Sequence, residues 1–223
     1  MQQGIELYSQ EWFKKRLGKV TSSTIWNLIV EPKEKAKKDA GELSSTSKEY
    51  LLSKVAEKLT GVRRDFQNDA TAFGVEQEAN AISLYELETG YSVSQTGYIE
   101  KITDWYGGTP DGYIEKENGI IQVKCPYDYK NHLSNLLTDS VELFKAKHRE
   151  YYWQCMSDMF VTGANWCDFV SYCPDMPADY KLSILRIKRS EEDIEILSHK
   201  ISEAYKFFNS VINKLADKHA RIS

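Results

Sequence analysis

The chain contains, at residues 109–126, the stretch TPDGYIEKENGIIQVKCP. Its central Glu-Asn-Gly segment is a typical signal for a tight β-hairpin. In the alternating geometry of a strand, Gln122 and Lys124 point to one face of the sheet and Val123 points to the other. A hairpin over this stretch carries Asp111 back beside Gln122 and Lys124. The pattern therefore predicts that an acid, an amide and an ammonium group converge on one point.

Such a convergence suits the hydrolysis of a phosphodiester with the help of divalent metal ions. Hard Mg²⁺ ions held by carboxylate, carbonyl and water oxygens can activate a water, neutralise the phosphoryl oxygens and assist the departing alkoxide. A neighbouring lysine can orient or deprotonate the attacking water. The usual pattern is Asp followed by Glu-x-Lys or Asp-x-Lys, whereas this chain has Gln122, whose amide oxygen brings no charge. On spacing alone, an ordinary hairpin explains the stretch equally well.

Length and composition predict a single domain over residues 1–223. A chain of 223 residues can bury a substantial core. It contains no apolar run long enough to span a membrane and no signal peptide, so we expect a cytoplasmic protein. The four cysteines and four histidines fit no zinc spacing. The net charge of −4 argues mildly against a general nucleic-acid coat protein but not against a nuclease with a local basic track.

The order of the expected elements predicts an α/β fold in which a mixed sheet is flanked by helices. Helices are expected from Ser9 to Gly18, over residues 25–29, 46–61 and 69–90, and, with a break, over 131–161. A final long amphipathic helix is expected over residues 191–218. Residues 31–45 are polar and loop-like. Strands are expected over residues 91–100, 105–109, 112–115, 120–125, 166–172 and 180–188.

Three further segments accompany the hairpin in a fixed order along the chain. They are Arg16-Leu17-Gly18 with the hydroxyl-rich run that follows, Phe73-Gly74-Val75-Glu76-Gln77-Glu78 on a helix, and Tyr151-Tyr152-Trp153-Gln154 on a later helix. Together these segments resemble the lambda exonuclease family, also called YqaJ-type viral recombinases, within the PD-(D/E)XK nuclease superfamily. The resemblance covers residues 12–174, and it implies a restriction-endonuclease-like core.

The resemblance implies a role for each matching residue around the hairpin. Asp111 matches the central metal-bridging aspartate, and Lys124 matches the catalytic lysine. Gln122 stands where the family has a metal-binding glutamate. The backbone carbonyl of Val123 and the carboxylate of Glu78 would complete the metal shell. Taken alone, Glu78 would be an ordinary solvated helix acid.

Four more residues are implied by the same resemblance. Gln154 matches a glutamine on the helix behind the site, although it could simply satisfy a buried backbone group. Arg16 and Ser23 match residues that cradle a terminal 5′-phosphate, and Thr109 stands in that pocket in place of a serine. An arginine suits this pocket because its fork pairs bidentately with phosphate oxygens. Alone, Arg16 could be a surface residue and Ser23 a helix cap.

The implied function is that of a phage-type alkaline exonuclease. It would degrade linear double-stranded DNA with a 5′-phosphate in the 5′ to 3′ direction, release mononucleotides and leave a 3′ overhang for recombination. The cofactor would be Mg²⁺, with Mn²⁺ as a substitute and Ca²⁺ non-productive. The resemblance also implies a homotrimeric ring, a single-strand annealing protein as partner, and a phage or prophage origin in a bacterial cytoplasm.

Gln122 leaves alternatives open. Either the chain is an inactivated variant that binds DNA without cutting it, or it natively uses the amide, in which case Glu78 must supply the missing charge. Two other functions remain: another RecB-like nuclease or an endonuclease of the same superfamily, and a non-catalytic DNA-end-binding protein.

Overall fold

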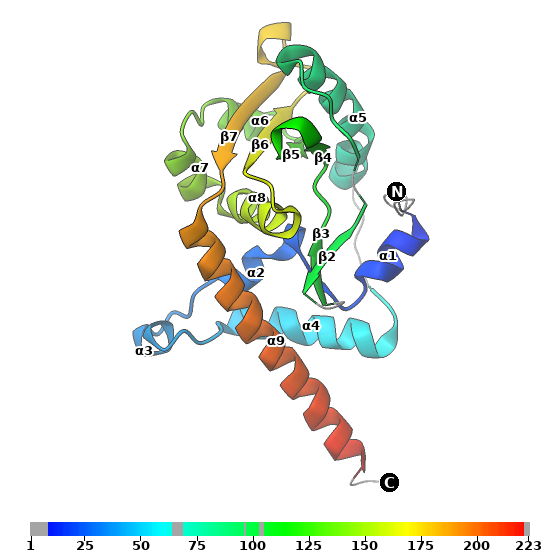
Figure 1. The fold of residues 1–223 in the computed structure, drawn as a ribbon, viewed down its shortest axis with the longest axis vertical. Coiled ribbons are helices and arrows are strands. Elements are labelled where there is room, and N and C mark those ends of the chain that lie inside the picture. The colour runs from blue at the N-terminus through cyan, green and yellow to red at the C-terminus, as the bar shows by residue number, and fades with distance from the viewer. Residues whose placement is uncertain (1–8, 64–68, 96, 103–104, 221–223) are drawn as a thin grey trace.

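The fold is centred on a four-stranded mixed sheet, in a computed structural model that describes residues 9–63, 69–95, 97–102 and 105–220, without the side chains of 69–71. Its strand order is β4-β5-β6-β7. The β4–β5 and β6–β7 pairs are antiparallel, and the β5–β6 pair is parallel. The strands are β4 (Gly112–Ile114), β5 (Gly119–Lys124), β6 (Trp166–Tyr172) and β7 (Leu182–Lys188). This mixed sheet with flanking helices confirms the expected fold class (Figure 1).

The predicted hairpin is formed by β4 and β5, with Gly112 opposite Ile121. A short 3-10 helix, η3 (Glu115–Glu117), makes the turn, and Asn118 ends it with a left-handed backbone at φ 47°. Asparagine tolerates that conformation better than most residues, which explains the strength of the turn signal. The Asp111 N–H donates to the Ile121 carbonyl at 3.2 Å, so the aspartate lies beside the centre of β5.

A second, three-stranded sheet has the order β1-β3-β2. Its strands are β1 (Val20–Thr21), β2 (Ile99–Ile102) and β3 (Tyr106–Gly108). The β1–β3 pair is parallel. The residues that follow the two strands, Ser22 and Ser23 after β1 and Thr109 after β3, therefore leave the sheet at the same edge.

Two helices cover opposite faces of the four-stranded sheet: α5 (Asp69–Thr89) and α8 (Arg149–Thr162). Along β5, Ile121 and Val123 pack in the cluster that contains residues of α5. Ile120 packs in the larger cluster that contains residues of α8. Because side chains alternate along a strand, the polar side chains at the intervening positions face α8.

The Asp168 carboxylate anchors α5 to the sheet from a buried position on β6. The Tyr85 hydroxyl of α5 donates to it at 2.7 Å. The Arg186 guanidinium of β7 pairs with the same carboxylate through two nitrogens, each at 2.8 Å. That guanidinium also lies over the Trp166 ring at 3.6 Å. This fully paired charge cluster holds α5, and hence the helix that carries Glu78, against the sheet.

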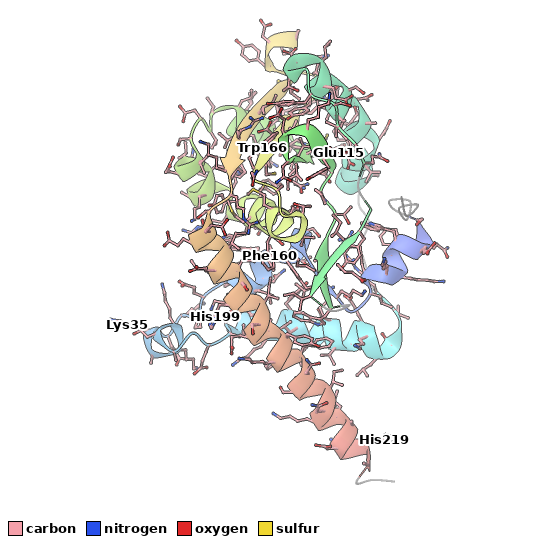
Figure 2. All side chains as sticks on the ribbon, viewed as in Figure 1. Lys35, Glu115, Phe160, Trp166, His199 and His219 are labelled. Atoms are coloured by element: carbon pink, nitrogen blue, oxygen red, sulfur yellow. The ribbon has the colours of Figure 1, made fainter. Side chains whose placement is uncertain are left out.

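The remaining helices surround this core. They are α1 (Gln10–Arg16), η1 (Ser22–Thr24), α2 (Trp26–Ile29), α3 (Lys35–Asp39), α4 (Ser45–Thr60), α6 (Tyr129–Leu136), α7 (Val141–Lys147), η4 (Ala178–Tyr180) and α9 (Glu191–Ala220). The first part of α9 packs against α4, and its last turns extend away from the body. Figure 2 shows His219 at that protruding end and Lys35 on the outlying α3.

Three local expectations differ from the structure. Residues 31–45 are not a continuous loop, because they contain α3. The helix expected over 46–61 begins one residue earlier, at Ser45, because the hydroxyl of Ser44 accepts the Ser47 N–H and caps α4. The strand expected over 91–100 begins only at Ile99 within the described part of the chain, although Ser94 forms an isolated bridge. None of the described helices is long and apolar enough to cross a membrane.

Candidate active site

One cavity of about 770 Å³ brings together every residue that the sequence proposed for the site. It lies where β5 ends, between the helices on the two faces of the sheet and the edge of the smaller sheet. The proposed residues that line it are Arg16, Ser23, Glu78, Thr109, Asp111, Gln122, Val123, Lys124 and Gln154. We call the part lined by Glu78, Asp111, Gln122, Val123 and Lys124 the acidic end. The hydroxyl end is lined by Arg16, Thr21, Ser22, Ser23 and Thr109.

At the acidic end, a chain of hydrogen bonds connects Asp111 with two amides. The Asp111 Oδ2 atom accepts the Val123 N–H at 2.6 Å and also accepts from Gln122 Nε2. The oxygen of the same amide accepts from Gln154 Nε2 at 2.8 Å. Gln122 is only 1% exposed, and its amide orientation follows from this network. Both ends of the Gln122 amide are therefore satisfied by the protein itself.

Burial and the polar neighbours of Asp111 have opposite effects on the pKa of its carboxyl. Burial raises the pKa of the carboxyl. The Lys124 charge, the Val123 N–H and the Gln122 amide each lower that pKa. The Lys124 ammonium also lies 5.5 Å from the centre of the Tyr151 ring on α8. The lysine thus stands on the same side of β5 as the Gln122 amide, as predicted from the strand alternation.

Glu78 and Cys125 complete the acidic end. Burial raises the pKa of the Cys125 thiol to about 12, and the nearby Glu78 and Asp111 carboxylates add to this. The thiol therefore stays protonated and offers no thiolate to a soft metal. The acidic end instead offers oxygen, from the Glu78 and Asp111 carboxylates, the Val123 backbone and the Gln122 amide.

These donors fit a hard cation such as Mg²⁺, which prefers carboxylate and carbonyl oxygens. The described residues contain no group of three or more His, Cys, Asp or Glu that could hold a metal ion. A glutamate at position 122 would add a carboxylate to those of Glu78 and Asp111, which line the same cavity. The Gln122 amide oxygen accepts from Gln154 with one lone pair and keeps a second lone pair for a cation.

The hydroxyl end is built around the buried guanidinium of Arg16. Its Nη2 atom donates to Ser23 Oγ at 3.2 Å and Thr21 Oγ1 at 3.4 Å. The guanidinium lies 3.8 Å from the centre of the Trp12 ring. Across the parallel β1–β3 pair, the Thr109 hydroxyl is buried without a hydrogen-bond partner in the described part of the chain. A guanidinium surrounded by hydroxyls is suited to an anion with several oxygens.

Two residues here escaped the sequence analysis. Ser22 is buried and lines the cavity next to Ser23. Asp158 is fully buried on α8, one helical turn beyond Gln154. Burial, the largest cause, raises the pKa of Asp158 to about 7. The four successive hydroxyl residues at 21–24 could have indicated Ser22, and the spacing of four from Gln154 could have indicated Asp158.

Comparisons with solved structures give two strong similarities. The alkaline exonuclease LHK-Exo from Laribacter hongkongensis is 30% identical, with a TM-score of 0.81 over 96% of this chain and 100% of that chain. LHK-Exo in complex with dAMP aligns equally well. A phage-related exonuclease from Haemophilus somnus 129PT is 25% identical, with a TM-score of 0.77 over 88% of this chain and 96% of that chain.

Two comparisons of sequence were informative in different ways. No curated protein matches this chain significantly. The YqaJ-like viral recombinase domain matches residues 11–165, which is most of the chain and contains all nine proposed site residues. The chain therefore belongs to the YqaJ-like viral recombinase family, with a fold of the PD-(D/E)XK type.

Proposed function

We propose that this protein is a phage-type exonuclease that degrades linear double-stranded DNA from its 5′ end. The family and the similarity to two exonucleases support a nuclease that acts on DNA. The observation that carries the finer proposal is the single cavity, which has an oxygen-rich acidic end and an anion-binding hydroxyl end. A terminal 5′-phosphate bound at the hydroxyl end would place the adjacent phosphodiester near the acidic end.

At the hydroxyl end, Arg16, Ser23 and Thr109 would bind the 5′-phosphate. The Arg16 guanidinium is held in place by the Trp12 ring and by its bonds to hydroxyls, so little side-chain freedom is lost on binding. The unpartnered Thr109 hydroxyl would gain a hydrogen bond that it lacks in the free protein. These contacts explain a preference for a phosphorylated end over an internal phosphodiester.

At the acidic end, Asp111, Glu78, the Val123 carbonyl and the Gln122 amide would hold Mg²⁺, with Mn²⁺ as a substitute and Ca²⁺ as a non-productive ligand. When bound, the cation supplies Lewis-acid stabilisation of the scissile phosphate and activates water. Lys124 would donate to the developing negative charge or orient the water. Gln154 would act as a positioning residue, because it holds the Gln122 amide at 2.8 Å.

The products would be mononucleotides and a 3′ single-stranded overhang. LHK-Exo, whose structure is similar, was solved in complex with dAMP. Because dAMP is a nucleoside monophosphate, that complex supports the release of single nucleotides. We also propose a homotrimeric ring and a single-strand annealing protein as partner, in the cytoplasm of a bacterial host whose phage or prophage encodes the protein. In a ring, only the channel needs positive potential, so a net charge of −4 presents no obstacle. Light scattering of the purified protein tests the trimer.

A second candidate function is a DNA-end-binding protein that does not cut. The observation that favours it is the Gln122 amide, both ends of which are paired within the protein. Such a protein would keep the hydroxyl end and lose the chemistry of the acidic end.

The test compares this chain with its Gln122→Glu variant on linear 5′-phosphorylated duplex DNA in Mg²⁺. A closed circular duplex is the control for endonuclease activity, and a 3′-labelled strand reports the direction of digestion. A Lys124→Ala variant serves as the matched inactive protein. Calorimetric titration of Mg²⁺ into the DNA-free proteins reports cation binding separately from cutting.

Each outcome selects one interpretation. Digestion from the 5′ end by both proteins supports the exonuclease and makes the amide a working ligand. Digestion by the Gln122→Glu variant alone identifies this chain as an inactivated form of the enzyme. If neither protein cuts while both bind DNA ends, the nuclease proposal fails and the end-binding function replaces it.

A further inference from the structure

Behind the hydroxyl end, next to Ser22, lies a buried acid that the mechanism above does not use. Asp158 is 0% exposed, and neither of its carboxylate oxygens has a hydrogen-bond partner in the described residues. A buried carboxylate without partners is costly, and a protein that retains one at the back of an anion pocket requires a physical explanation.

Gly108 shows how close Asp158 lies to Ser22. A Cβ atom at Gly108 would collide with Ser22 Oγ and would lie 2.6 Å from Asp158 Oδ1. The two oxygens therefore face the same small volume at the end of β3. The Ser22 hydroxyl also lowers the pKa of the Asp158 carboxyl, as expected of a hydrogen-bond donor beside it. A small rotation of either side chain would make a hydrogen bond between them.

A chain of three hydroxyl groups determines where the proton of the Ser22 hydroxyl can point. The Tyr106 hydroxyl lies 2.5 Å from Ser157 Oγ, and Ser157 donates to Ser22 Oγ at 2.8 Å. Because Ser157 has a single proton and gives it to Ser22, Tyr106 must donate to Ser157. The proton of Ser22 is then the free end of the chain. Ser22 lines the cavity, so this proton can go either to a ligand or to Asp158.

We propose that Asp158 is a proton-linked positioning residue for the 5′-phosphate pocket. When its carboxyl is protonated, it donates to Ser22 Oγ, and the Ser22 hydroxyl is free to donate to the terminal phosphate. When it is ionised, it takes the Ser22 proton for itself and places a negative charge behind the bound dianion. This inference rests on the proposed recognition of a 5′-phosphate and adds a specific partner to it.

Phosphate binding and proton uptake are then coupled. The pKa of Asp158, about 7 in the free protein, must rise further when a phosphate dianion binds beside it. Binding above neutral pH therefore takes up one proton from solvent. Since the phosphate is already a dianion above pH 7, this proton dependence belongs to the protein and not to the ligand.

Other ionisable groups face Asp158 from the elements packed around it. The positive charges of Arg16 on α1 and Lys124 on β5 lower its pKa, and the Asp111 carboxylate raises it. Tyr106 on β3 and Cys167 on β6 also interact with its charge, and burial raises the pKa of both, so they stay protonated. Asp111 is common to every variant below, so a comparison with an Asp158 variant isolates the effect of Asp158.

The experiment measures end preference, which is the Kd for a 5′-hydroxyl duplex divided by that for a 5′-phosphate duplex. Fluorescence anisotropy measures each Kd at pH 7 and pH 9. EDTA in the buffer prevents both cleavage of the DNA and binding of divalent cations. The proteins are the full chain, its Asp158→Asn variant and its Ser22→Ala variant. Thermal unfolding in the same buffers confirms that each variant is folded.

For the unmodified chain, we expect the preference for the phosphorylated end to fall about tenfold from pH 7 to pH 9. The Asp158→Asn variant should show a preference that changes less than about twofold, because an amide does not titrate in this range. The Ser22→Ala variant should have a weak preference at both pH values, since it lacks the hydroxyl that Asp158 controls.

Other outcomes separate the inference from the proposed function. If the unmodified chain and the Asp158→Asn variant prefer the phosphorylated end with the same pH dependence, the role of Asp158 is wrong and end recognition stands. If the Ser22→Ala variant keeps the full pH dependence, the role of Asp158 through Ser22 is also wrong, even when the Asp158→Asn variant does not fold. If the unmodified chain shows no preference at either pH, the proposed recognition of the 5′-phosphate fails, and the inference fails with it.

Discussion

The acidic end and the hydroxyl end of the cavity differ in how their polar groups are satisfied. At the acidic end, Asp111, Gln122 and Gln154 form a closed chain in which each contact pairs a donor with an acceptor. At the hydroxyl end, Thr109 and Asp158 have buried oxygens without hydrogen-bond partners among the described residues. Unpaired buried groups cost free energy, which a ligand can recover on binding.

The comparison identifies what the glutamine contributes. A glutamate at position 122 would place a second carboxylate against Asp111, and the two charges would repel unless a cation lay between them. The amide removes that repulsion and gives Asp111 a hydrogen-bond donor. The polar groups of the acidic end are therefore paired without a ligand. The hydroxyl end instead keeps unpaired groups that a ligand can satisfy. The following predictions test this difference.

The largest effect is expected from Asp111→Asn at the acidic end. The variant keeps an oxygen for the Val123 N–H and the Gln122 amide but loses the charge that would hold a cation. We expect DNA digestion in Mg²⁺ to slow by at least about a thousandfold. Initial rates of nucleotide release measure this loss, and circular dichroism confirms the fold. A variant that digests DNA at more than a tenth of the original rate would remove Asp111 from the proposed metal site.

The next effect concerns stability at the hydroxyl end. The folded-state pKa of Asp158 is raised to about 7 from an ordinary value near 4, so its favourable contribution is present at low pH and lost as pH rises to 7. The Asp158→Asn variant should therefore gain stability relative to the original chain between pH 4 and pH 7, by up to about 4 kcal/mol. Urea unfolding at pH 5 and pH 8 measures the difference, and equal differences at the two values would contradict the prediction.

A smaller effect of opposite sign is expected from Gln122→Glu at the acidic end. In EDTA, the new carboxylate meets Asp111 without a donor between them, and we expect a loss of about 2 kcal/mol in the free energy of unfolding. Added Mg²⁺ should restore that stability by binding the folded state. Differential scanning fluorimetry with and without Mg²⁺ checks both parts. Unchanged melting temperatures in EDTA would mean that the amide does not stabilise Asp111.

The smallest effect is expected from Thr109→Val. Because the Thr109 hydroxyl has no partner within the described structure, its removal should change the free energy of unfolding by less than about 1 kcal/mol. The affinity for a 5′-phosphorylated duplex should fall about fivefold, while that for a 5′-hydroxyl duplex stays the same. Ser23→Ala is the matched comparison, since Ser23 is already paired with Arg16. A large loss of stability would show that Thr109 is structural.

Much of this arrangement could be predicted from local patterns in the sequence. The hairpin follows from its turn residues, and the common face of Gln122 and Lys124 follows from strand alternation. The ordered segments of the family resemblance supplied Arg16, Glu78 and the other lining residues, all of which reached the same cavity.

What could not be predicted depends on contacts between distant segments. Asp158 stands in a helix of buried residues, and its spacing of four from Gln154 places it on the same helix face without showing what it meets there. Its importance comes from Ser22, 136 positions earlier, which meets it only once β1 and β3 have paired. The direction of the Gln122 amide is also invisible in sequence, since it depends on Gln154 across the sheet–helix interface.

The close approach at Gly108 has a consequence for how this chain can vary. In a library with every residue at position 108, nearly all substitutions should fail, although the backbone there lies outside the left-handed region. The space that a side chain needs is occupied by the oxygens of Ser22 and Asp158. A suppressor of Gly108→Ala is therefore expected at one of those two positions. Its smaller side chain would make space for the new methyl group and would remove part of the proton-sensitive pair.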